Sequence, residues 1–268
     1  MMPQLLPGRL DGPTGERVSA PRILHHFRKL LLMCGLFGCA GYIPKSKKHA
    51  LISSLAIQNV SRGNHSTGVG ILTCDGRHEI VKNAMVAHNF IQRKAFVEAL
   101  KIPALATIGH CRHATQGDVK NANAHPFRFG SIVATHNGMV HNVNKMRCWT
   151  QKEFEVDSQY LVWALANHGH LGPAEGSLTL AYFDVRDPSY ILALSRHNRP
   201  LAYAITKDGR GVVYSSELNH LVTCCAVAGI EIQSYHEQKN FTEVVFSQGH
   251  KQKIEITTIP TPSDKLLF

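Results

Sequence analysis

The sequence predicts an α+β fold with antiparallel sheets. Short apolar and alternating segments come in runs, separated by turn signals such as Asp75-Gly76 and Asp208-Gly209. Helical patterns fall between these runs, unlike the regular strand–helix alternation of a parallel sheet. The 268 residues are 44% hydrophobic and 18% charged. This length and composition favour one ordered domain with a sizeable core.

The elements of the first half follow from apolar patterning and turn residues. A buried strand comes first, and Ser46 is expected to cap the helix after it. A polar turn over residues 61–68 then leads into a hairpin, an amphipathic helix and a long strand. The expected ranges are 34–43, 46–60, 69–74, 78–85, 90–100 and 104–114.

The second half begins with a polar loop over residues 118–126. A short buried strand over 131–135 ends at His136-Asn137-Gly138, and a helix over 157–167 has Asp157 near its start. Strands are then expected at 178–184, 190–195, 201–205, 212–215, 231–235, 242–247 and 253–259, with a helix at 218–228.

The composition argues against several classes of protein. Seven cysteines show no regular spacing and no CxxC pair, which indicates reduced thiols and a cytoplasmic location. No apolar run approaches the roughly 20 residues of a membrane helix, and residues 30–33 are too short for a secretory signal. The net charge is +10, but lysines and arginines are scattered. This pattern favours a solvated basic surface over a nucleic-acid site.

Residues 1–33 differ from the rest of the chain. Prolines and glycines interrupt them and leave only a weak helical pattern over 23–32. We expect translation to begin at Met33 and the initiator to be removed, so that residues 1–33 are a leader and 34–268 form the domain. Two alternatives stay open: a propeptide cut before Cys34, and an organelle-targeting peptide, which Asp11 and Glu16 disfavour.

Cys34 stands out when it is considered as the first residue of a mature protein. It would then carry a thiol and a free α-amino group, whose unperturbed pKa is roughly 7.7–8.0. The amine could act as the base for its own thiol, so no separate histidine would be required. The alternative is a small buried cysteine in a core strand.

Three further stretches carry groups suited to an amino-acid ligand. Arg112 at a strand end could bind a carboxylate, or form a surface salt bridge. Asn137-Gly138 could present two donors to an oxyanion, or form a type I′ turn. Asp157 could bind an ammonium group, or cap a helix. Together these groups describe a pocket for glutamine.

The motifs stand in the order found in a known family, and the sequence resembles the class II glutamine amidotransferases, which are N-terminal nucleophile hydrolases. The resemblance covers most of the chain, from about residue 34 to 247. Its motifs are Met33-Cys34-Gly35-Leu36-Phe37-Gly38, Ser61-Arg62-Gly63, Ser66-Thr67-Gly68, Gly109-His110-Cys111-Arg112-His113-Ala114-Thr115 with Gly117, Asn123-Ala124-His125-Pro126-Phe127, His136-Asn137-Gly138, Asp157-Ser158, Arg199-Pro200-Leu201 and Ser215-Ser216-Glu217.

The resemblance implies a fold and a set of catalytic groups. The fold is a four-layer αββα sandwich of two mostly antiparallel sheets between helix layers. Cys34 is the nucleophile, and its α-amine is the base. Asn137 and Gly138 form the oxyanion hole, and Arg62 supports the nucleophile from behind.

The resemblance also implies a set of groups that bind substrate. Arg112 and Thr115 hold the carboxylate of glutamine, and Asp157 holds its ammonium group.

The sequence departs from the family around this pocket. The family often has an acidic residue at His65, an aromatic residue at His113 and a histidine at Gln116. These departures lie around the pocket and its covering loop, so they bear on substrate affinity and loop closure and not on the core chemistry.

The resulting expectation is a glutaminase domain that hydrolyses L-glutamine through a Cys34 thioester and supplies ammonia to a separate synthase. Two alternatives stay open: a stand-alone γ-glutamyl-type amidohydrolase, and a catalytically silent regulatory subunit. No cofactor is expected, and the oligomeric state is left open. No metal is expected either, because strand alternation points His110 away from Cys111 and His113.

Overall fold

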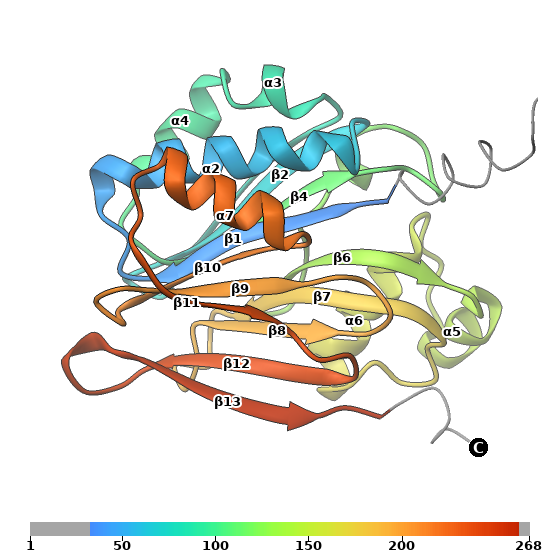
Figure 1. Cartoon of the computed structure of the whole chain (residues 1–268). Helices are drawn as coiled ribbons and strands as arrows, with labels where there is room; N and C mark the ends of the chain where they lie inside the picture. Colours follow the sequence, from blue (N-terminus) through green and yellow to red (C-terminus); the bar gives the residue numbers. More distant parts are fainter. Residues whose placement is uncertain (1–32, 263–268) are drawn as a thin grey trace, which may run out of the picture. The chain divides into compact units, whose positions relative to one another are not determined.

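The computed structural model describes residues 33–262, which form two antiparallel sheets (Figure 1). The seven-stranded sheet has the order β11-β9-β10-β1-β4-β2-β3. The six-stranded sheet has the order β13-β12-β8-β7-β6-β5. Residues 1–32 of the expected leader, with the helical pattern over 23–32, lie outside the described residues.

The seven-stranded sheet has β1 near its centre, paired with β10 on one side and β4 on the other. Its strands are β1 (Gly35–Gly41), β2 (Ser66–Thr73), β3 (His78–Asn83), β4 (Ala104–Arg112), β9 (Ala202–Thr206), β10 (Gly211–Ser215) and β11 (Ile232–Glu237).

The six-stranded sheet is built mostly from the second half of the chain. Its strands are β5 (Phe127–Phe129), β6 (Ile132–Val140), β7 (Gly176–Asp184), β8 (Leu192–Arg196), β12 (Thr242–Gln248) and β13 (Ile254–Pro260).

Helices cover the outer faces of both sheets (Figure 1). The seven-stranded sheet carries α2 (Lys45–Gln58), α3 (Ala87–Phe90), α4 (Lys94–Lys101) and α7 (Leu218–Val227). The six-stranded sheet carries α5 (Val143–Thr150) and α6 (Asp157–His168). Strands β1 and β4 contact β6 across the sandwich. The predicted α+β class and its four layers are therefore confirmed.

The alternation of side chains along β1 links two cores. Phe37 points toward the helices and packs with Leu51 and Leu221. Its neighbour Leu36 points the other way, into an apolar layer between the sheets that includes Phe183. A third core lies under α6. Burial on both faces explains why β1 reads as a continuous apolar run.

Two expected elements of the first half differ at their ends. The helix over 46–60 is not capped by Ser46, because Pro44 occupies the N-cap and its carbonyl accepts the amides of Lys47 and Lys48. The helix over 90–100 is divided into α3 and α4, and this bend brings the rings of Phe90 and Phe96 together in the core.

Two polar stretches expected in turns lie inside strands. Ser66-Thr67-Gly68 begins β2 and pairs with both β3 and β4. Asn137-Gly138 lies within β6, opposite Thr179 and Leu178 of β7, so the type I′ turn was wrong. The remaining strands and helices lie near their expected positions, whereas β5, α5 and three short 3₁₀ turns (Asn59–Ser61, Asn121–Asn123 and His250–Gln252) were not expected.

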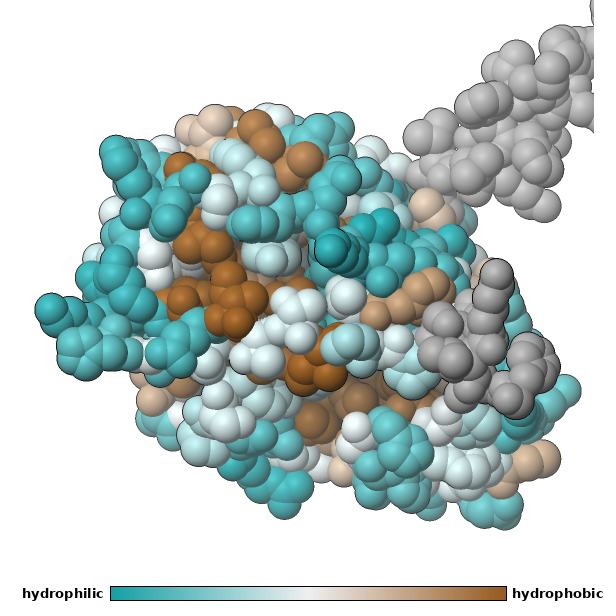
Figure 2. Space-filling view, turned by 60° about the horizontal axis from the view of Figure 1, so that its bottom comes forward, coloured by the Kyte–Doolittle hydropathy of each residue, from teal (hydrophilic) through white to brown (hydrophobic). Residues whose placement is uncertain are grey.

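The face in Figure 2 is mostly hydrophilic, with apolar side chains gathered in patches. Exposed apolar residues among those described include Ile256 and Ile259 of the edge strand β13. Within residues 33–262, no helix has the length and apolar character needed to cross a membrane.

We expect Phe183→Ala to lower the free energy of unfolding by about 3–5 kcal/mol, because it opens a cavity between the sheets. Phe183 is 0% exposed, whereas the control residue Ile256 is 42% exposed. Ile256→Ala is expected to cost less than about 1 kcal/mol. Urea unfolding of both variants measures the difference, and equal losses would contradict the assignment of this core.

Candidate active site

Cys34 lies immediately before β1 and is half-buried. Its Sγ accepts a hydrogen bond from the amide of His113 (3.3 Å) and lies 3.5 Å from the carbonyl oxygen of the same residue. Burial raises the pKa of the Cys34 thiol to about 11, and the His113 amide and the charge of Arg112 offset only part of this effect. The thiol therefore needs a nearby base to react at neutral pH.

The backbone around Cys34 is held from two sides. Arg62 donates from Nε to the Cys34 carbonyl oxygen (3.0 Å), and its guanidinium pairs with Glu217. Ser216 makes two hydrogen bonds with Leu36. Its Oγ accepts the Leu36 amide (2.9 Å), and its backbone amide donates to the Leu36 carbonyl (2.8 Å). These contacts fix where β1 begins, and with it the position of Cys34.

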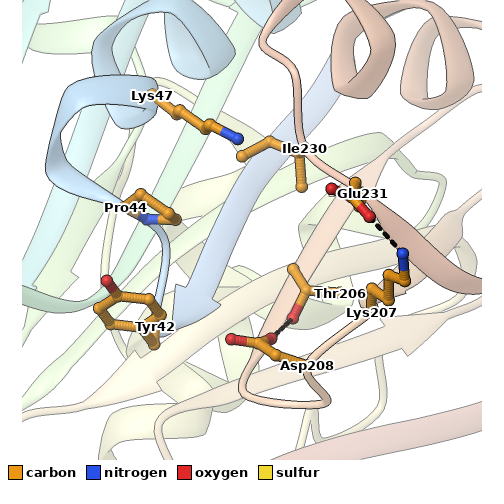
Figure 3. A pocket seen from close by; sticks show the side chains of 8 residues that line it. All are labelled: Tyr42, Pro44, Lys47, Thr206, Lys207, Asp208, Ile230 and Glu231. Atoms are coloured by element: carbon orange, nitrogen blue, oxygen red, sulfur yellow. Dashed lines mark hydrogen bonds and ion pairs between the residues drawn. The ribbon is translucent and has the colours of Figure 1, made fainter.

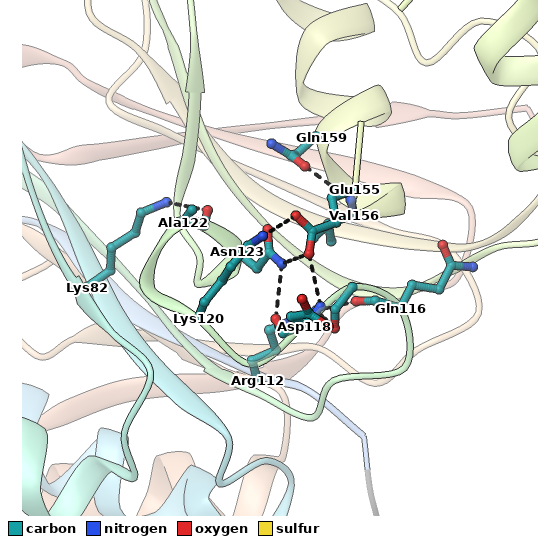
Figure 4. A network of polar contacts seen from close by, with 11 residues as sticks. Lys82, Arg112, Gln116, Asp118, Lys120, Ala122, Asn123, Glu155, Val156 and Gln159 are labelled. Atoms are coloured by element: carbon teal, nitrogen blue, oxygen red, sulfur yellow. Dashed lines mark hydrogen bonds and ion pairs between the residues drawn. The ribbon is translucent and has the colours of Figure 1, made fainter. Parts of the chain in front are cut away.

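Arg112 ends β4 and is only 2% exposed. Its guanidinium donates to three carbonyls of the following loop, those of Gln116, Gly117 (3.4 Å) and Asp118 (3.1 Å). It forms no ion pair with a carboxylate within residues 33–262, so the surface salt bridge is wrong. Thr115 is exposed on this loop, and the side chain of Gln116 points away from the network (Figure 4).

The far end of this loop is clamped to the segment before α6 (Figure 4). Glu155 accepts the Asp118 amide (3.1 Å) and the Asn123 side-chain amide (2.7 Å), and it pairs with Lys120 (2.5 Å). These donors lower the pKa of Glu155 to about 2. The loop is thus fixed both beside Cys34 and beside α6.

Asn137 carries an unused amide in a buried place. The residue is 1% exposed, yet neither Nδ2 nor Oδ1 has a hydrogen-bond partner. Such groups are nearly always paired in folded proteins, so the two polar atoms of this side chain are available to a ligand. Gly138 follows with φ +158°, and a Cβ there would lie 1.7 Å from the Ser177 carbonyl oxygen.

Asp157 is the first residue of α6, with Val156 at the N-cap, so the N-cap alternative is wrong. It is 4% exposed, and its carboxylate accepts the backbone amides of Val140 (2.9 Å) and Ser158 (2.8 Å). No lysine or arginine of the described chain pairs with it. A buried carboxylate without a cation is suited to an ammonium ligand.

The structure brings most of the expected residues together. The charges of Arg112, Asp157 and Arg62 all act on the pKa of Cys34. Asn137 and Gly138 lie on β6, which packs against β1 and β4. Thr115 and Gln116, also expected at the site, lie on the loop whose residue His113 contacts Cys34.

Several residues of the site carried no assigned role in the sequence. Glu217 and Arg199 lie in motifs quoted above. Glu217 pairs with Arg62. Burial lowers the pKa of Arg199, and the charge of Cys34 acts against this shift. His65 stacks its ring on that of His113 (4.8 Å between centroids). The role of Glu155 in holding the loop could not be predicted, because nothing in the sequence distinguishes it from Glu153.

Within 33–262 no group of three or more histidines, cysteines or acidic residues is arranged to hold an ion. His110 donates to the carbonyl of His136 (2.9 Å), whereas Cys111 donates to that of Ala56 (3.3 Å), so the two side chains point to opposite faces of β4.

A cavity of about 300 Å³ lies at the other end of β1 (Figure 3). Seven strand residues at about 3.3 Å each separate it from Cys34, roughly 20 Å in all. Four of its lining residues are paired with one another: Thr206 donates to Asp208 (2.6 Å), and Lys207 pairs with Glu231 (2.6 Å). This cavity is not part of the Cys34 site.

We expect Cys34 to alkylate slowly near neutral pH while residues 1–33 are attached, because its thiol pKa is raised to about 11. Cys74, which is exposed, serves as the internal control. Iodoacetamide labelling from pH 7 to 10, read by peptide mass spectrometry, should show Cys74 modified well before Cys34. Faster labelling of Cys34 at pH 7 would refute this description of the thiol.

Residues 33–159 match the family model of the class-II glutamine amidotransferases. The glutamine–fructose-6-phosphate aminotransferase [isomerizing] of Clostridium acetobutylicum is 30% identical over 211 residues, covering 70% of this chain and 33% of that protein. The enzyme of the same name from Mycolicibacterium paratuberculosis is 27% identical over 195 residues, covering 65% of this chain and 31% of that protein. The chain thus spans about a third of the length of these curated relatives.

Two solved structures share the fold. The allosteric regulatory enzyme of purine biosynthesis superposes with a TM-score of 0.65 at 18% identity, covering 86% of this chain and 50% of that one. A glutamine aminotransferase class-II domain protein from Silicibacter pomeroyi gives a TM-score of 0.50 at 12% identity, covering 86% and 99%. The first likeness confirms the αββα sandwich of the N-terminal nucleophile hydrolases. With the matched family model and the amidotransferase relatives, it follows that this chain belongs to the class-II glutamine amidotransferase family.

Proposed function

We propose that this chain hydrolyses the side-chain amide of L-glutamine, with Cys34 as nucleophile, and supplies the ammonia to a separate synthase. The observation that carries the proposal is that Arg112 and Asp157 both lie near Cys34, where their charges act on the pKa of its thiol. A thiol that feels both a fixed cation and a fixed anion suits a substrate that is itself a zwitterion. The synthase is inferred from the relatives, whose names describe an aminotransferase and which are about three times as long as the matched region.

Glutamine binds by its two charged ends. Asp157 receives the ammonium group, since its carboxylate is buried and lacks a cation within the described chain. Arg112 receives the carboxylate together with the hydroxyl of Thr115. Three loop carbonyls already accept hydrogen bonds from the two Nη atoms of Arg112. A guanidinium has five N–H donors, so the Nε–H and further donor capacity remain for the substrate.

The reaction follows from a thiol and an α-amine on one residue. The Cys34 thiol gives its proton to its own α-amine as the S–C bond to the amide carbon forms. The side chain of Asn137 and the amide of Gly138 stabilise the tetrahedral oxyanion, and each such donor is typically worth about 2.7–4 kcal/mol. The amine then gives the proton to the leaving nitrogen as the C–N bond breaks, and water hydrolyses the γ-glutamyl thioester to glutamate.

This chemistry requires Cys34 to be the first residue of the active protein, because an amide nitrogen is not a base. The raised pKa of the thiol makes the base necessary, since little thiolate forms unaided. Arg62 supports the terminus by binding the Cys34 carbonyl, which leaves the α-nitrogen free of that contact.

We expect Cys34→Ala to abolish release of ammonia from glutamine by a protein that begins at residue 34. Cys74→Ala, which changes an exposed thiol, is the matched control and should keep wild-type kcat. A coupled glutamate assay measures both. Equal kcat for Cys34→Ala and wild type would end the proposal.

We expect Asp157→Asn and Asn137→Ala to separate binding from chemistry. Removing the carboxylate should mainly raise KM, because the ammonium group loses its partner. Removing an oxyanion donor should lower kcat by about 10²–10³-fold with a smaller change in KM. Steady-state kinetics with glutamine distinguishes the two effects, and the reverse pattern would contradict the assigned roles.

A further inference from the structure

Lys82 lies on β3, an edge strand of the seven-stranded sheet, and its side chain is half-buried. Its Nζ donates to the backbone carbonyl oxygens of Ala124 (2.7 Å), Pro126 (3.0 Å) and Ala122 (3.4 Å). An ammonium group has three N–H donors, so these three carbonyls account for all of them. Lysines on edge strands usually project into solvent, where they discourage pairing with another chain. Lys82 instead holds a loop that lies 40–44 residues further along the chain.

The ammonium group of Lys82 has an aromatic neighbour but no acidic one. Its Nζ lies 4.7 Å from the centroid of the Phe127 ring. It forms no ion pair within the described residues 33–262. Burial lowers the pKa of Lys82 to about 8, so the group is still mostly protonated at pH 7. Carbonyl oxygens and the ring face therefore take the place of water around this cation.

The loop reaches Lys82 because it passes close to β2 at Gly68. Gly68 and Lys82 are paired between β2 and β3. A Cβ at Gly68 would lie 2.1 Å from the carbonyl oxygen of His125 and 2.6 Å from the Cβ of Lys82. The missing side chain thus leaves room for the loop against the sheet. Asn121 adds a second contact at this edge, since its Oδ1 accepts the backbone amide of Ala84 (2.8 Å).

The same loop is connected to the guanidinium of Arg112. Asn123 lies in the loop, and its Nδ2 donates to the carbonyl oxygen of Asp118 (3.0 Å) and to Glu155 (2.7 Å). The Asp118 carbonyl also accepts Nη1 of Arg112 (3.1 Å). Figure 4 shows Lys82 extending toward this network from β3. A displacement of the loop would therefore move the carbonyl that orients Arg112.

We propose that Lys82 is a positioning residue whose ammonium group acts as an internal cation, fixing the loop over residues 122–126 and, through Asn123 and Asp118, the guanidinium of Arg112. The kinetic consequence rests on the proposed function, in which Arg112 binds the carboxylate of glutamine. Loss of the cation should then weaken glutamine binding, because it frees the loop without removing any group that takes part in the chemistry.

The first test compares Lys82→Met with Lys101→Met at pH 7, in the protein that begins at Cys34. Methionine keeps an apolar chain of similar length but has no charge and no donor. We expect Lys82→Met to raise KM for glutamine roughly tenfold, in keeping with the loss of hydrogen bonds from a charged group, and to leave kcat nearly unchanged. Lys101 is exposed and pairs with Glu98 on its own helix, so Lys101→Met should match wild type. An unchanged KM in Lys82→Met, or a fall in kcat alone, would overturn the inference.

Chemical rescue tests whether a cation is what the loop requires. The atoms of Lys82 beyond Cβ correspond to n-propylammonium, so this ion can enter the space that Lys82→Ala opens. n-Propylammonium chloride should lower the KM of Lys82→Ala toward the wild-type value, whereas sodium chloride at the same ionic strength should not. Lys82→Met should show no rescue, because its side chain fills the space. No rescue of Lys82→Ala, or equal rescue of both variants, would overturn the role of the cation.

A readout on the loop itself keeps the inference separate from the proposed function. The backbone amides of Asn123 and Ala124 donate to the carbonyls of Lys120 (3.0 Å) and Asn121 (3.2 Å). Their hydrogen exchange should be faster in Lys82→Ala and slow again with n-propylammonium. If no protein released ammonia but exchange behaved in this way, the positioning role would stand and the proposed function would fail. Exchange unaffected by Lys82→Ala would overturn the positioning role.

A measurement on the wild-type protein decides the matter if the variants do not fold. Hydrogens of an ammonium group that are held by carbonyls exchange slowly with water. The ¹⁵N-labelled wild type should therefore give a side-chain ammonium signal for Lys82 at pH 7 and none for the exposed Lys101. The absence of a Lys82 signal would overturn the inference.

Discussion

The site depends on one arrangement, the placement of Cys34 immediately before the first residue of the central strand β1. This strand is paired on both sides and buried on both faces, so its backbone has little freedom. Arg62 binds the carbonyl of Cys34 just before the strand, and Ser216 binds Leu36 within it. The amide of His113, the residue after β4, donates to the thiol sulfur. Every other group of the site is useful only because it is placed relative to this sulfur.

Burial both creates and limits the chemistry. The same desolvation that strengthens contacts with Asp157 and Asn137 raises the pKa of the thiol to about 11. In the proposed mechanism, the free α-amine of Cys34 resolves this conflict, because it supplies a base without a further buried charge. The Asn137 side-chain amide has no hydrogen-bond partner within the described residues, and the Asp157 carboxylate accepts backbone amides but has no cation there. A zwitterionic amide ligand would supply partners to both.

The fold class could be predicted from the sequence, because runs of strands are a local signal. Separate motifs also pointed to Arg112, Asp157 and Arg62, whose charges act on Cys34 in the structure, while their roles stay predictions. Asp157 was expected at the start of a helix, and α6 begins there. Asn137-Gly138 was expected after a strand, but its partner β7 lies about 40 residues further on, and long-range pairing extends β6 through it. The three carbonyls that accept the Lys82 ammonium group lie 40–44 residues further along the chain, so no local pattern could reveal this contact.

The central claim is that Cys34 works as an N-terminal residue, and ammonia release from two forms of the chain tests it most directly. One form begins at Cys34 and the other retains residues 1–33, with each N-terminus verified by intact mass. The account predicts that only the first form hydrolyses glutamine, because only there is the α-nitrogen a base. Equal kcat for both forms would contradict the account and would require another group to accept the proton of the thiol.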